Sequence, residues 1–146
     1  MDYIKKAIDD NRQKSEYLDS YLTINEMVME RLSESNISAA RELMNKKRAI
    51  ITGIHVIDDK IIRDVEQIKL SCDVEDLSEL DANEFPELRE LKDLAMKVLR
   101  KMVDVKKSDE AVSDKIDAVF EDYKNEKGKF DKGKLQVFTK KFFDPE

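Results

Sequence analysis

Residues 88–123, LRELKDLAMKVLRKMVDVKKSDEAVSDKIDAVFEDY, form the segment that decides the fold. Read at alternating steps of three and four, its inward positions are Leu88, Leu91, Ala95, Val98, Met102, Val105, Asp109, Val112, Ile116, Val119 and Tyr123. All but Asp109 are apolar or aromatic, and a pattern kept over about five heptads predicts a long helix of the coiled-coil type. Such a helix, with one apolar stripe, is not stable alone, so the rest of the chain must cover it.

The composition agrees with long amphipathic helices. Charged residues make up 41% of the 146 positions, yet the apolar residues occur in phase, which argues against disorder. The chain has only three glycines and two prolines, which indicates few turns. The length suits one domain.

Two further helices are predicted, over 3–34 and 37–70. The inward positions of the first are Ile4, Ile8, Asn11, Ser15, Leu18, Leu22, Asn25, Met29 and Leu32. Those of the second are Ala40, Leu43, Lys47, Ile50, Ile54, Ile57, Ile61, Val65 and Ile68. Asn36 is a suitable N-cap between them, and Pro86 suits the first turn of the third helix, over 86–127.

Short connections between these helices predict an all-α, elongated, antiparallel three-helix bundle over 1–128, with a short tail element over 129–146. In the acidic linker 71–88, Leu77 and Leu80 are expected to form a short helical turn that covers the end of the bundle. Gly53, in the middle of the second helix, is interpreted as a tolerated surface glycine in preference to a point of close helix approach.

The register of this bundle predicts one polar layer. Pairing the helices about their connections places Asn25 near Lys47 and Lys47 near Asp109. These three are polar residues in otherwise apolar seams. We therefore expect them to lie in one layer, with Lys47 and Asp109 paired, at some cost in stability.

Several classes of function find little support. The net charge of −6 disfavours nucleic-acid binding, and the single Cys72 excludes an internal disulfide and a thiolate zinc cluster. No apolar run is long enough to span a membrane. His55 is the only histidine and lacks an evident catalytic partner, and no phosphate-binding loop is present. We expect a cytoplasmic protein that is not an enzyme and needs no metal or other cofactor.

The tail 129–146 combines lysines with Phe130, Leu135, Val137, Phe138, Phe142 and Phe143. Disordered tails are poor in aromatic residues, so this composition favours a segment that packs on something. A fourth short element across the bundle, a membrane-surface element, and a segment that competes for or helps form a groove for a partner helix all remain open.

Residues 30–59, ERLSESNISAARELMNKKRAIITGIHVIDD, resemble flagellar export chaperones of the FlgN and FliT type. The similarity lies in a turn of small polar residues and a following helix. In that helix Leu43, Lys46, Lys47 and Arg48 precede isoleucines and an aspartate. The ending FFDPE, with the preceding YKNEKGK, is similar to the aromatic-Asp endings of some members.

The resemblance implies a cytosolic chaperone that binds the C-terminal amphipathic helix of a flagellar hook-associated or filament-cap protein. It would prevent premature assembly and deliver this client to the export apparatus. The expected partner-binding residues are Val112, Ile116, Val119, Phe120, Tyr123, Leu135, Phe138, Phe142 and Phe143. Ordinary core packing competes with that role, and for Val112, Ile116 and Val119 it is the favoured interpretation. The alternative function is a coiled-coil structural or adaptor protein that self-associates, as a homodimer, through its apolar stripe.

Overall fold

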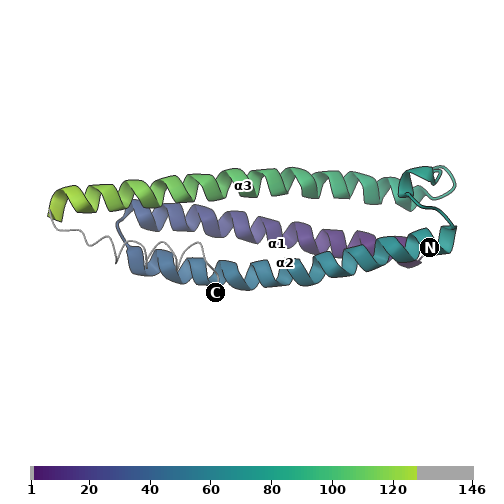
Figure 1. Cartoon of the computed structure of the whole chain (residues 1–146), viewed down its shortest axis with the longest axis horizontal. Helices are drawn as coiled ribbons and strands as arrows, with labels where there is room; N and C mark the ends of the chain where they lie inside the picture. The colour runs from purple at the N-terminus through teal and green to yellow at the C-terminus, as the bar shows by residue number, and fades with distance from the viewer. Residues whose placement is uncertain (1, 128–146) are drawn as a thin grey trace. The chain divides into compact units, whose positions relative to one another are not determined.

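The structure, a computed structural model, describes residues 2–127, without the side chains of 125–127. It contains the helices α1 (Asp2–Ser33), α2 (Ile37–Cys72) and α3 (Pro86–Lys127), and the short 3-10 helix η1 (Leu77–Glu79) (Figure 1). Within the described residues there is no strand, and helices pack on helices, so the predicted all-α bundle is confirmed. The predicted tail 129–146 lies outside the described residues.

The helix ends follow local backbone chemistry. Ser35 and Asp73 have φ angles of 58° and 53°, the left-handed conformation that ends many helices. The N–H of Asn36 then donates to the carbonyl of Arg31 at 2.8 Å, and the N–H of Val74 donates to that of Lys69 at 3.1 Å. These bonds satisfy carbonyls that the helix itself leaves without partners. The predicted cap is also present, because Asn36 Oδ1 accepts from the Ala39 N–H at 3.2 Å.

The linker between α2 and α3 folds back as predicted. Asp76 caps η1 by accepting from the Ser78 N–H, while the Glu79 side chain accepts from the Asp76 N–H. Leu77 and Leu80 pack against a buried cluster described below. α3 begins at Pro86, whose missing N–H costs nothing in a first turn.

The described residues form two compact units, and each long helix contributes one segment to each. Unit 1 comprises 2–20 and Ile51–Val103, and unit 2 comprises Tyr21–Ile50 and 104–127.

Unit 1 has a core built from all three helices. Its buried cluster is Ile4, Ala7, Ile8, Ile68, Leu88 and Leu91. Between α1 and α2, Lys6 pairs with Asp64 and Lys14 pairs with Asp58 at 2.6 Å, so these two segments are antiparallel.

Ion pairs also show the direction of α3 relative to α1 in unit 1. Lys5 of α1 lies 3.7 Å from Glu87, and Asp19 of α1 lies 2.8 Å from Lys101. Later residues of α1 thus meet later residues of α3, so α1 and α3 run parallel in this unit. The order is up, down, up, as short connections require.

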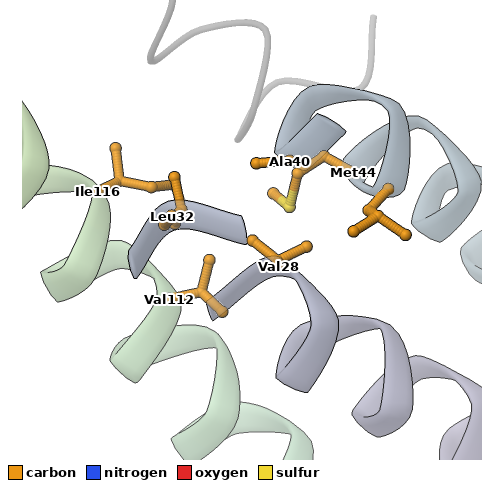
Figure 2. Packing of buried hydrophobic residues seen from close by; sticks show 7 residues of the cluster. Val28, Leu32, Ala40, Met44, Val112 and Ile116 are labelled. Atoms are coloured by element: carbon orange, nitrogen blue, oxygen red, sulfur yellow. The ribbon is translucent and has the colours of Figure 1, made fainter. Parts of the chain in front are cut away.

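The core of unit 2 is a second apolar cluster. Figure 2 shows Val28 and Leu32 of α1 with Ala40 and Met44 of α2 and Val112 and Ile116 of α3. Ile24, Met29, Ile37, Val119 and Phe120 pack against this cluster from its edges.

Two of the predicted inward positions of α3 are wrong. Met102 is 43% exposed and Tyr123 is 48% exposed. At the first, the neighbouring Lys101 is turned toward α1, where it reaches Ser15 and Asp19, so Met102 is turned outward. At Tyr123 the cause is the end of α1. Ile116 packs in one cluster with Leu32, and α1 ends one residue later, at Ser33. Tyr123 lies two turns further along α3, beyond that end.

The interpretation of Gly53 as a tolerated surface glycine is wrong as well. A Cβ at this position would lie 2.9 Å from Cζ and 3.1 Å from Oη of Tyr17. Glycine therefore lets the phenol ring of α1 lie directly on the backbone of α2, in unit 1. This contact compensates for the poor helix propensity of glycine.

A double-mutant cycle tests this contact. In a Tyr17→Ala background, Gly53→Ala should raise the free energy of unfolding by about 1 kcal/mol, the usual propensity difference. In the wild-type background the gain should vanish, because the phenol ring must move to admit the methyl group. Urea unfolding of the four variants measures both values. Equal gains in the two backgrounds would show that the ring does not restrict position 53.

Candidate partner-binding surface

The predicted polar layer is present in unit 2. Lys47 Nζ lies 2.9 Å from Asp109 Oδ1, and Asn25 Nδ2 donates to the same oxygen at 3.0 Å. Tyr21 Oη donates to Asp109 Oδ2 at 2.6 Å, so one carboxylate gathers three donors from two helices. The Lys47 ammonium also lies 4.5 Å from the centre of the Tyr21 ring, a cation–π distance. Periodicity alone did not indicate the part of Tyr21.

Burial dominates the electrostatics of this layer. Asn25 is fully buried and Lys47 is 5% exposed. Burial lowers the pKa of the Lys47 ammonium, while the hydrogen bond and the charge of Asp109 act in the opposite direction. Burial and then Asp109 raise the pKa of the Tyr21 phenol, which therefore stays a neutral donor. The layer thus holds one cation and one anion together.

Replacement of Asp109 should reveal the free-energy cost of burying the Lys47 charge. Asp109→Leu leaves the Lys47 ammonium buried without a counter-charge. We expect a loss of about 3 kcal/mol in the free energy of unfolding, the lower end for a buried pair, because the Asp109 side chain is 40% exposed. The second change in Lys47→Met/Asp109→Leu removes that charge and should recover part of the loss. Urea unfolding compares the two, and a double variant no more stable than Asp109→Leu would contradict the assignment of the cost to Lys47.

Unit 1 contains a second buried polar group that sequence reasoning missed. Asp64 of α2 is 1% exposed and lies beside Asp10 of α1, also buried. One oxygen of each carboxyl, Oδ2, has no hydrogen-bond partner among residues 2–127. Lys6 Nζ lies 3.6 Å from the other oxygen of Asp64. Burial, followed by the Asp10 carboxyl, raises the pKa of Asp64 to about 6, and Lys6 opposes this shift.

This carboxyl pair predicts a pH dependence of stability. The folded chain holds the Asp64 proton more tightly than the unfolded chain does, so lowering the pH from about 7.5 to about 5.5 should raise the unfolding temperature. Asp64→Asn removes the titration and should raise the unfolding temperature at the higher pH. Thermal unfolding followed by circular dichroism checks both effects. The raised pKa of Asp64 would be contradicted if the unfolding temperature of the wild type fell as the pH is lowered over this interval. It would also be contradicted if the unfolding temperature of Asp64→Asn changed with pH as much as that of the wild type.

The predicted partner-binding residues occupy different environments. Val112 and Ile116 are each 1% exposed, in the core of unit 2, and Val119 and Phe120 are half-buried against it. Tyr123 is exposed. Leu135, Phe138, Phe142 and Phe143 lie outside the described residues. Val112 and Ile116 are therefore already covered by α1 and α2.

A different set of apolar side chains is uncovered. Met96, Leu99, Met102 and Val103, which we name the exposed face of α3, belong to unit 1 and are between 43% and 54% exposed. They follow one another at steps of three, three and one, so they occupy one side of the helix. The signal in the sequence is a series of doubled apolar positions, Ala95–Met96, Val98–Leu99 and Met102–Val103. In each of the first two pairs, the second member is turned farther out than the first.

Arginine and lysine surround the exposed face. Lys92 and Arg100 lie one helical turn before and after Met96, and Arg89 lies one turn before Lys92. All three are exposed, and within the described part of the chain none forms an ion pair. The carboxylates Glu87 and Glu90, by contrast, already pair with Lys5 and Arg12 of α1. This side of α3 is thus both apolar and basic.

Among the described residues, the exposed large apolar side chains of α1 and α2 are at least six positions apart along each helix, so they do not form a stripe at helical spacing; they are Tyr3, Met27, Val56, Ile62 and Leu70. No helix within residues 2–127 is long and apolar enough to cross a membrane. Among these residues, no three His, Cys, Asp or Glu side chains come together in a way that could hold a metal ion. His55 is exposed on α2, and Cys72 is a half-buried free thiol at the end of that helix.

Comparisons with known proteins find no matching family model, no matching curated protein and no matching solved structure.

Proposed function

We propose that this protein is a non-enzymatic cytoplasmic chaperone that binds an amphipathic helix of a secreted flagellar subunit. The observation that carries the proposal is the exposed face of α3, where four large apolar side chains of one helix side meet solvent. A second helix laid along this side would bury them by ridges-into-grooves packing. The resemblance of residues 30–59 to flagellar export chaperones supports the choice of client.

The binding surface in this proposal differs from the one that the sequence predicts. Val112 and Ile116 would have to leave the core of unit 2 before they could contact a client, and large apolar residues leave a core at a cost of about 2 kcal/mol each. Met96, Leu99 and Val103 need no such opening. The exposed face of α3 is therefore the primary contact in our proposal.

Self-association through the same face is the rival function. A second copy would cover the same apolar side chains, and the protein would then act as a coiled-coil adaptor. A second copy would also add its own Arg89, Lys92 and Arg100 to the interface, and like charges at an interface are unfavourable. The charges around the face thus favour a different partner.

Co-purification tests the proposal. The chain is co-expressed with the C-terminal segments of hook-associated and filament-cap proteins, and one of them should be retained. Leu99→Glu, which places a charge on the exposed face, should weaken retention about tenfold or more, as loss of a central apolar contact does. Ala111→Glu, at an exposed position of the same helix, is the matched control and should bind normally.

The outcomes separate the two functions. Retention of no segment, together with a dimer in sedimentation equilibrium that Leu99→Glu dissociates, would replace the chaperone by the adaptor. Retention that Leu99→Glu leaves unchanged would remove the exposed face from the proposal. Truncation after Gly128 in the same assay decides whether Leu135, Phe138, Phe142 and Phe143 act as a cover or clamp, since unchanged retention would exclude that role.

A further inference from the structure

We infer that the segment received by the exposed face of α3 is an acidic amphipathic helix of a partner protein. This inference rests on the proposed function and adds the chemistry of the partner. It follows from the charges beside the apolar side chains and not from the apolar side chains themselves.

The cations lie where the flanks of a docked helix would pass. Lys92 is four residues before Met96, and Arg100 is four residues after it and three before Val103. Residues at these spacings are neighbours on a helix surface, so both cations border the apolar side chains. Arg89 extends the same border by a further turn. Carboxylates on a docked helix would come within reach of all three.

The remaining charges of α3 in unit 1 do not neutralise this border. Glu87 and Glu90 face α1, where Lys5 and Arg12 pair with them. Lys101 faces α1 as well, with Asp19 and Ser15. Asp93, three residues before Met96, is the acidic residue that remains near the cations. Lys97, an exposed cation one turn after Asp93, balances that carboxylate. The three cations of the border therefore make this side of α3 locally basic, although the whole chain carries a net charge of −6.

The size of the site also indicates a helix. From Arg89 to Val103 the basic and apolar residues extend over roughly 20 Å of α3, at 1.5 Å per residue. A partner helix of about four turns matches this length. An anionic membrane surface shares the same chemistry, but stable surface binding uses a broader apolar face with more cations than this one has.

Two synthetic peptides test the inference on the full chain. Both have about 15 residues and the same leucine stripe at helical spacing, and they differ only in flanking residues, glutamate in one and lysine in the other. At about 50 mM salt the glutamate peptide should bind about five- to tenfold more tightly, because each of three exposed ion pairs contributes a factor of about two. The preference should shrink as the salt concentration rises.

Charge reversal supplies the second arm. Lys92→Glu/Arg100→Glu should reverse the preference between the peptides, with the fold unchanged by circular dichroism. Lys60→Glu/Arg63→Glu, at two exposed positions of α2, is the control for net charge and should keep the preference. Fluorescence anisotropy of labelled peptides measures each affinity.

Each outcome has a distinct meaning. Equal affinities for the two peptides, or preference for the lysine peptide, would overturn the acidic partner and leave the proposed function standing. Both proposals would be overturned if neither peptide bound and if Leu99→Glu also left retention in the co-purification unchanged. Binding to vesicles of anionic phospholipid in place of either peptide would show that the cations serve a membrane surface, which overturns the inference.

Discussion

The contact of Lys47 with Asp109 is the constraint on which the structure of unit 2 depends. A lysine ammonium at 5% exposure has lost most of its water, and the neighbouring carboxylate replaces it. A shift of α2 against α3 by one residue would separate the two charges and leave the cation buried among apolar side chains. Apolar side chains around the layer tolerate such shifts far better, because dispersion contacts are not directional. The register is therefore specified by a pair that itself adds little stability.

Unit 1 uses charge differently. Two ion pairs connect α1 to its neighbours near the edges of the core: Lys14 with Asp58 of α2, and Asp19 with Lys101 of α3. In addition, two carboxyl groups lie side by side, those of Asp10 and Asp64. Lys6 offsets part of the repulsion between them. Such a pair costs stability near neutral pH. In the same unit, Gly53 has no side chain, and this allows the Tyr17 ring to pack closely against α2.

The exposed face of α3 follows from the geometry of a three-helix arrangement. Each helix has neighbours on only one side of its circumference, so an apolar stripe wider than that contact leaves residues outside it. Val98 is buried while its neighbour Leu99 is 54% exposed. The exposed apolar area connects the packing of unit 1 to the proposed binding of a helix, and the cations beside it have no ion pair among residues 2–127. The core residues Val112 and Ile116, by contrast, already meet Leu32 and Val28.

The amino-acid sequence by itself determined the helices, because their signals are local. The heptad pattern, the cap at Asn36 and Pro86 predicted the bounds of α1, α2 and α3 to within two residues. It also determined the polar layer, since Asn25, Lys47 and Asp109 are polar interruptions whose spacing from the turns is countable. Only the tertiary structure decided which apolar residues remain outside the core and which glycine receives a neighbouring ring. Exposure of Met102 and contact of Gly53 with Tyr17 depend on how helices distant in sequence approach one another, and no periodicity within one helix contains that information.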